Sequence, residues 1–226
     1  MKKTIALLLT AVILLGAAGC GADEDAKNTS APGGQSEVSQ AKPEKKEHSA
    51  TLTAGIYTVG VDIPAGTYDL TAQSGSGNVS SSNLYDGGVN ELMGVKDNDL
   101  YQETFQGAKL TDGVTFKIGG TLTLKIDTKE ADTGSMKKRN NPASKEYTFS
   151  SGNYTCGDDF EPGEYVITAV SGSGNVSSDN LLKGGINEIM SEEAGELYIS
   201  SFQNANFEDG VKLAVSGVKI KLTPSK

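Results

Sequence analysis

Two pairs of carboxylates are the residues that could support acid–base chemistry in this chain of 226 residues. Asp62 and Glu91 lie in the first half, and Asp159 and Glu188 follow them at matching positions in the second half. Two converging carboxylates can hydrolyse a glycosidic bond, one acting as the acid and the other as base or nucleophile. Because spacing alone does not make either pair converge, a carboxylate-dependent hydrolase of carbohydrate is an alternative hypothesis.

Other catalytic machinery lacks its parts in the sequence. The sole histidine, His48, falls in a segment that reads as a linker, so a Ser-His or Cys-His arrangement within a folded domain is excluded. H-E-x-x-H, C-x-x-C and P-loop patterns do not occur. We therefore expect no catalytic residue, no metal site and no cofactor. A milder calcium hypothesis rests on residues 97–99 (DND), which offer oxygen ligands outside any EF-hand pattern.

Polar residues that recur in both halves suggest ligand binding. Amide and carboxylate side chains could line equivalent grooves, and two weak sites on one chain would gain avidity for a repetitive target. The competing interpretation is that a recent duplication left these residues alike and that asparagine simply fills turns. The candidate binding residues are Asn78, Asn90 and Glu91, with Asn175, Asn187 and Glu188.

A sequence repeat organises the chain. Residues 74–81 (SGSGNVSS) recur unchanged at 171–178, and residues 87–93 (GGVNELM) recur as GGINEIM at 184–190. A repeat of this length predicts two similar small domains from an internal duplication. We name residues 51–128 repeat 1 and residues 147–226 repeat 2, and expect a linker at 129–146 between them.

The elements within each repeat read as strands. Residues 114–118 and 121–126 alternate apolar and polar side chains, as a half-buried strand requires. Residues 218–222 alternate in the same way if one residue has been lost near Gly119. Asp112-Gly113 predicts a hairpin turn, and the apolar spacing at 89–93 and 186–190 predicts one or two helical turns. The pattern favours an all-β class, with two tandem sandwich-like or barrel-like domains.

The first residues resemble the lipobox region of bacterial lipoproteins. Lys2 and Lys3 precede an apolar stretch at 5–15, which is too short to span a bilayer, and small residues lead to Cys20. The resemblance implies that the signal peptide, residues 1–19, is removed and that Cys20 becomes a diacylated N-terminus in the bilayer. Residues 20–50 are polar and rich in Ser, Gly and Lys, which predicts a flexible linker after the anchor.

The charge balance limits the partners. The whole chain carries −9, and without Lys2 and Lys3 the remaining 18 basic and 29 acidic residues give −11. Acidic repeats argue against nucleic acid and against docking on an anionic lipid surface. Once Cys20 is acylated, Cys156 remains alone, and because Val59 holds the matching position we expect it to fill a small apolar slot.

A second resemblance concerns the repeats themselves. Residues 57–68 (YTVGVDIPAGTY) resemble a Y-x-V-G-x-D-I-P-A-G-x-Y repeat of secreted proteins and lipoproteins of Gram-positive bacteria. It implies a small extracellular β module of unknown role without catalytic residues. The sequence thus predicts a lipid-anchored, extracytoplasmic, non-enzymatic protein of a Gram-positive bacterium. Its expected partners are a cell-wall glycan or a matrix or envelope protein, with a role as a subunit of an envelope complex as a further alternative.

Overall fold

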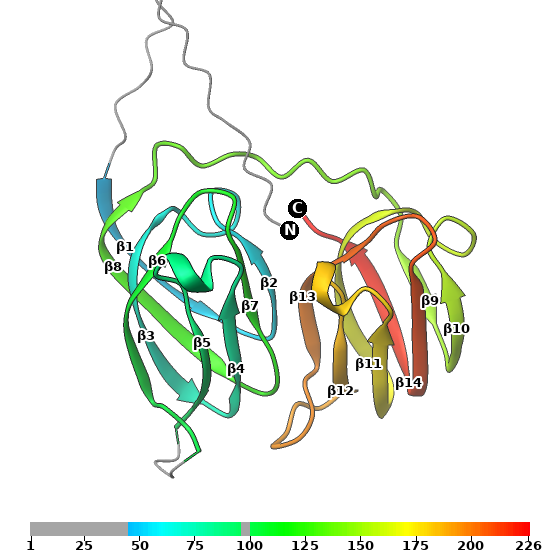
Figure 1. Ribbon diagram of the computed structural model, residues 1–226. Coiled ribbons are helices and arrows are strands. Elements are labelled where there is room, and N and C mark those ends of the chain that lie inside the picture. Colours follow the sequence, from blue (N-terminus) through cyan, green and yellow to red (C-terminus); the bar gives the residue numbers. More distant parts are fainter. Residues whose placement is uncertain (1–44, 96–99) are drawn as a thin grey trace, which may run out of the picture. The chain divides into compact units, whose positions relative to one another are not determined.

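The computed structural model describes residues 45–95 and 100–226, whose strands are drawn in Figure 1. All of them lie within the compact unit Gln40–Lys226. Repeat 1, together with the residues that extend it to 45–132, contributes β1 to β8, and repeat 2 contributes β9 to β14, with a short 3-10 turn, η1 or η2, in each. The first eight strands and their turn are β1 (Lys45–Leu52), β2 (Gly55–Thr58), β3 (Gly66–Ser74), β4 (Ser76–Ser81), η1 (Leu84–Asp86), β5 (Asn90–Gly94), β6 (Thr104–Leu110), β7 (Thr115–Ile118) and β8 (Thr123–Asp132). The second set is β9 (Tyr147–Phe149), β10 (Gly152–Thr155), β11 (Gly163–Ser178), η2 (Leu181–Lys183), β12 (Asn187–Ser191), β13 (Ser201–Phe207) and β14 (Lys212–Pro224). The all-β prediction is confirmed.

Repeat 1 is built from two strand layers. One layer has the order β1-β8-β3-β6, and the other has the order β2-β7-β4-β5. The second layer continues into repeat 2, because β13 pairs with β2: one ten-stranded sheet has the order β10-β14-β11-β13-β2-β7-β4-β5, with β12 paired to β11 and β9 paired to β14. The long strands β11 and β14 therefore each span what two shorter strands span in repeat 1.

Glycines explain how the strands turn from one layer into the other. The chain adopts positive φ at Gly75 (66°) and Gly120 (69°) in repeat 1, and at Gly172 (75°) and Gly217 (77°) in repeat 2. Only glycine enters this region without a steric cost. The glycine pair at 120 and 217 also locates the sequence slip, because the next buried residue is Leu122, two positions after Gly120, but Val218, one position after Gly217. The expected single-residue offset near Gly119 is therefore consistent with the burial pattern.

Each repeat has a core of its own. In repeat 1 the fully buried side chains include Tyr68, Phe116 and Leu124, and in repeat 2 they include Tyr165 and Phe202. Cys156 is 1% exposed and occupies the position of Val59, which is also 1% exposed. The expected small apolar slot for this cysteine is thus present. Among the described residues, no helix has the length and apolar character needed to cross a bilayer.

Two local predictions were wrong. Residues 89–93 and 186–190 do not form helical turns: β5 and β12 are strands paired with β4 and β11. Strand pairing with the neighbouring SGNVSS segment outweighs the weak helical spacing, and it buries Met93 and Met190. The turn at Asp112-Gly113 does not close a hairpin, because β6 pairs with β3 while β7 pairs with β2 and β4. It carries the chain between layers.

The expected linkers are shorter than predicted. β1 begins at Lys45, so residues 45–50 are strand rather than linker, and β8 extends to Asp132. The two extensions pair with each other, and Ala131 is buried. His48 is therefore part of the folded sheet, with its ring edge-on to Tyr68 at a centroid distance of 6.2 Å. Sequence composition concealed this, because β1 is an exposed edge strand with polar side chains.

Candidate functional site

The residues of the YTVGVDIPAGTY segment build a corner between β2 and β3. Asp62 Oδ2 accepts a hydrogen bond from the Thr58 amide at 2.7 Å, and the Tyr68 hydroxyl donates to the Pro64 carbonyl at 2.7 Å. Repeat 2 reproduces both contacts, with the Thr155 amide donating to Asp159 at 2.7 Å and the Tyr165 hydroxyl to the Glu161 carbonyl at 2.7 Å. The motif thus has a structural role that requires no ligand.

These contacts bear on the hydrolase alternative. Asp62 holds its own corner and also pairs through Oδ1 with the Arg139 guanidinium, while Asp159 holds the equivalent corner. Glu91 is half-buried on β5, and Glu188 accepts hydrogen bonds from the Gly120 amide at 3.2 and 3.3 Å. Asp62, Asp159 and Glu188 are thus each engaged in a local contact, and the two grooves described below are lined by other residues.

The predicted binding residues divide between two sides of the β4–β5 hairpin. Asn78 and Asn90 are exposed and adjacent, with Asn78 Nδ2 donating to Asn90 Oδ1 at 3.4 Å. Glu91 lies opposite Val79, on the side that faces the core. In repeat 2, Asn175 and Asn187 are likewise exposed on β11 and β12, and Glu188 lies opposite Val176. The structure therefore brings the asparagines together and separates the glutamates from them.

A groove of about 580 Å³ runs between the repeats, and we call it the junction groove. Its floor is the outward face of β2, β7 and β4 in repeat 1, and its wall is η2 and β13 of repeat 2. The floor is polar and the wall adds two leucines from η2. The lining includes Thr58, Asn78, Ser80, Thr115 and Lys117 from repeat 1, and Leu181, Leu182, Asn204 and Asn206 from repeat 2. Of the predicted residues, Asn78 belongs to it.

Charged side chains of both signs stand at this junction: Lys183 and Glu164 line the groove together with Lys117, and Glu188 lies close to Lys117. Lys117 is half-buried and donates from Nζ to the Gly185 carbonyl at 3.3 Å. Burial lowers its pKa, an effect that Glu188 opposes. Burial likewise raises the pKa of Glu188, against the Gly120 hydrogen bond and the attraction of Lys117. Two partly desolvated groups of opposite charge therefore stand on either side of the junction.

The wall of the junction groove is fixed by β13. A bulge in β13 places Gln203 and Asn204 against β2, where the Gln203 amide donates to the Ala54 carbonyl at 3.0 Å. Asn204 has a φ of 55° and donates from Nδ2 to the Ile56 carbonyl at 3.0 Å. A left-handed non-glycine residue is uncommon and costs strain energy unless its surroundings fix it. Sequence analysis missed Asn204, although its matching residue, Gly107, signals a positive φ.

Apolar and ionic contacts join the repeats as well. The side chains of Ala54 and Ile56 come from repeat 1 but belong to the hydrophobic core of repeat 2, and Ile56 is 7% exposed. Arg139, whose side chain is 5% exposed, pairs with Asp62 of repeat 1 and Glu164 of repeat 2. The segment expected as a free linker, 129–146, therefore carries a contact that ties the repeats together.

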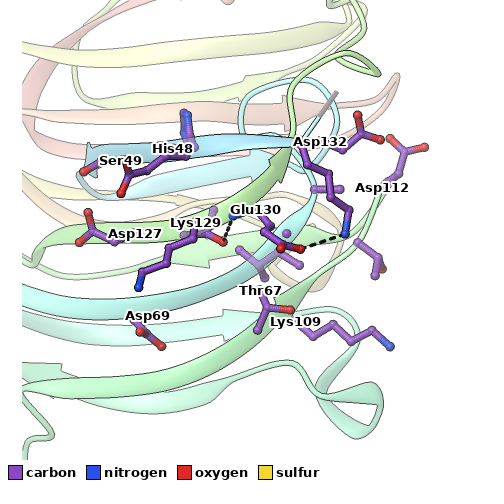
Figure 2. Close-up of a pocket in the computed structure, with 17 residues that line it drawn as sticks. His48, Ser49, Thr67, Asp69, Lys109, Asp112, Asp127, Lys129, Glu130 and Asp132 are labelled. Carbon is purple, nitrogen blue, oxygen red and sulfur yellow. Dashed lines mark hydrogen bonds and ion pairs between the residues drawn. The ribbon is translucent and has the colours of Figure 1, made fainter. Parts of the chain in front are cut away.

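A larger groove of about 780 Å³ lies on the β1-β8-β3 sheet of repeat 1, where Figure 2 shows side chains of both charges. Asp69 and Asp127 lie directly opposite each other on β3 and β8. Two like charges in this position destabilise the strand pair. Asp69 accepts from the Gly107 amide at 3.0 Å, and a hydrogen bond from Ser49 is the main cause that lowers the Asp127 pKa. The ion pair between Lys45 and Glu130, at 3.1 Å, joins two exposed side chains and contributes little stability.

The predicted lipidation site, Cys20, and the candidate calcium ligands, residues 97–99, lie outside the described residues. Within the described parts of the chain, no cluster of three or more His, Cys, Asp and Glu side chains is arranged to hold a metal ion. Cys156 is a free, buried cysteine, and burial is the main cause that raises the pKa of its thiol to about 11.

Comparison with known proteins adds little to this description. No protein-family model matches the chain, and no curated protein matches it. A solved structure, described as a cupin 2 conserved barrel domain protein from Leptotrichia buccalis, is similar over 80% of this chain and 79% of its own. The sequence identity is 13% and the TM-score is 0.22, so this similarity carries no argument about fold or function.

Proposed function

We propose that the chain is a lipid-anchored, extracytoplasmic binding protein of the bacterial envelope, which holds a polyhydroxylated ligand in the junction groove. Cys20 carries the acyl chains, and the polar residues after it tether the compact unit to the membrane. Two or more acyl chains are needed for stable anchoring, since each buried methylene contributes about 0.8 kcal/mol. The sequence before β1 supports this part of the proposal.

The observation that carries the ligand class is the lining of the junction groove. Asn78, Ser80 and Thr115 offer amides and hydroxyls, which both donate and accept hydrogen bonds. Leu181 and Leu182 line the opposite wall, and both are exposed. Hydroxyls that flank the apolar face of a sugar ring match such a surface, so a cell-wall glycan is the ligand class that we favour. Asp62 and Glu188 are engaged in local hydrogen bonds, which favours a binding protein over a hydrolase that uses these carboxylates.

Paired variants test the groove. Soluble peptidoglycan fragments are titrated into the chain from residue 21 onward, which contains the whole compact unit Gln40–Lys226. Asn78→Ala should weaken binding about two- to tenfold, as expected when one hydrogen bond worth about 0.5–1.5 kcal/mol is lost. Asn175→Ala, the same change at the matching position of repeat 2, should leave the affinity unchanged. Absence of binding by the unaltered chain, or equal losses in both variants, contradicts the proposal.

The anchor is tested separately. The full chain is expressed in a Gram-positive host with radiolabelled palmitate, with Cys20→Ala as the matched control. The unaltered chain should carry the label and sediment with membranes, and the variant should do neither. Label on the variant would show that another residue is acylated, and an unlabelled wild-type chain would refute the anchor.

A further inference from the structure

The lining of the junction groove has an excess of positive charge, although the chain as a whole carries −9. Two lysines, Lys117 and Lys183, line it with one carboxylate, Glu164. The larger groove on the sheet of repeat 1 is lined by six carboxylates and three lysines. A groove of about 550 Å³ on β10, β11 and β14 of repeat 2 is lined by one charge of each sign, Lys212 and Asp179. The signs of these charges favour an anionic ligand in the junction groove over the other two grooves.

The one carboxylate in this lining is already engaged within the fold. Glu164 pairs with the guanidinium of Arg139, whose side chain is 5% exposed. Arg139 also pairs with Asp62, and the Thr58 amide donates to the same carboxylate. Glu164 is therefore committed to a contact that ties the two repeats together, which leaves the two lysines as the lining charges to be explained.

The ammonium group of Lys117 is only partly compensated. Its Nζ donates to the Gly185 carbonyl at 3.3 Å, which leaves N–H groups of the ammonium for other acceptors. Burial lowers the pKa of Lys117 more than the nearby Glu188 carboxylate raises it. A further negative charge beside Lys117 would therefore stabilise its charged form.

Lys183 is the lining charge that has no partner. It is the last residue of η2 and is exposed, and its ammonium makes no hydrogen bond or ion pair with any residue in the described ranges, 45–95 and 100–226. Gly185, which accepts the hydrogen bond from Lys117, follows Lys183 by two residues, and two residues of chain span at most about 7 Å. Both lysines therefore lie near the C-terminal end of η2.

The matching positions of the other repeat hold no positive charge. Ala214 matches Lys117, and Asp86 matches Lys183. The turns that carry Asp86 and Lys183 have similar backbones, since the glycine after each adopts a positive φ, 90° after η1 and 100° after η2. The two repeats thus differ in charge, rather than in backbone, at the turn whose η2 copy lines the junction groove.

We propose that the ligand of the junction groove carries an anionic group, a carboxylate or a phosphate, which pairs with Lys183 at the end of the groove where Lys117 also lies. This inference rests on the proposed function, because it names the group by which the polyhydroxylated ligand is held. The amides and hydroxyls of the floor bind the sugar or polyol part, and Leu181 and Leu182 contact its apolar face. The lysines then select an acidic glycan or polyol polymer over a neutral one.

Matched ligands test this charge in the chain from residue 21 onward. Calorimetry measures the affinity for soluble peptidoglycan fragments, for the same fragments with amidated carboxylates, and for a glycerol phosphate polymer, each at low and high salt. One of the two acidic ligands should bind more tightly than the amidated fragments, which tells a carboxylate from a phosphate, and salt should weaken that binding. Lys183→Gln should weaken it about two- to fivefold, as expected for the loss of one exposed ion pair, and should leave binding of the amidated fragments unchanged.

Lys212→Gln is the matched control, because it removes the same charge from the groove of repeat 2 and should leave every affinity unchanged. Both lysines are exposed, so thermal unfolding should show that both variants keep the fold. If the unaltered chain binds the amidated fragments as tightly as either acidic ligand, this inference is overturned while the proposed function stands. Equal effects of Lys183→Gln and Lys212→Gln overturn it as well. Binding of none of the three ligands would contradict the proposed function itself, and this inference with it.

Discussion

Ile56 provides the sharpest test of whether the repeats depend on each other. Its backbone lies in β2 of repeat 1, but its side chain packs in the core of repeat 2 and is 7% exposed. Ile56→Ala should therefore destabilise repeat 2, although the substitution is in repeat 1. Removing a buried isoleucine side chain down to Cβ costs about 2–5 kcal/mol, depending on how far the surroundings collapse.

The buried thiol of Cys156 reports on repeat 2 alone. Cys156 is 1% exposed and its thiol pKa is raised to about 11, so a thiol reagent reacts only when repeat 2 opens. In the chain from residue 21 onward it is the sole cysteine. If opening is in rapid equilibrium, the labelling rate follows the opening free energy, and about 1.4 kcal/mol changes it tenfold. Ile56→Ala should accelerate labelling by roughly 30-fold to several thousandfold.

The control and the refuting result are equally specific. Leu92→Ala, at a side chain 42% exposed on β5, should change the rate by less than about threefold, because exposed sites cost within about 0.5 kcal/mol. If Ile56→Ala leaves the labelling of Cys156 unchanged while the chain loses global stability, repeat 2 opens independently of β2. The packing of Ile56 in the second core would then be refuted.

Three further predictions concern the corners and the charges. Tyr68→Phe and Tyr165→Phe should each lower the unfolding free energy by about 1 kcal/mol in urea denaturation, because each removes the hydroxyl donor to a corner carbonyl; unequal losses would show that the corners differ. Asp62→Ala should lower the unfolding free energy by about 1–2 kcal/mol more than Asp159→Ala, since it also deprives the buried Arg139 of a partner. Equal losses would show that the ion pair between Arg139 and Asp62 does not stabilise the fold. A hydrogen bond from Lys145 is the main cause that lowers the Glu161 pKa from 4.5 to about 2. The stability that Glu161→Gln removes should therefore be present above pH 4.5 and vanish as pH falls toward 2, in unfolding followed across that range; a loss independent of pH would contradict this assignment.

The sequence predicted the fold class because side-chain alternation is a local property. Val114 to Ile118 show it directly, and the burial of Phe116 and Ile118 follows. The prediction of helical turns failed at β5 and β12, where the spacing of Val89 and Met93 suits a helix as well as a strand. Pairing of β5 with β4 decides between them, and apolar spacing within one segment carries no information about its pairing with another.

The candidate site was only partly predictable, for a similar reason. Asn78 and Asn90 were found because they recur, and their adjacency follows from the hairpin. The groove itself depends on how one repeat packs against the other, and recurrence cannot show that. Differences between the repeats carry this information: Ile56 against Asn153, and Gly107 against Asn204, mark the residues that make contact.

Ligand binding in the junction groove is tested most directly by NMR, by following backbone amide signals while soluble peptidoglycan fragments are added to the chain from residue 21 onward. We expect the signals of Asn78, Thr115 and Asn204, which line the junction groove, to move together and saturate. The signals of Asn175, Lys212 and Gly107, which match them in the other repeat, should remain in place. Equal movement of both sets, or movement of neither, would contradict the assignment of the ligand to the junction groove.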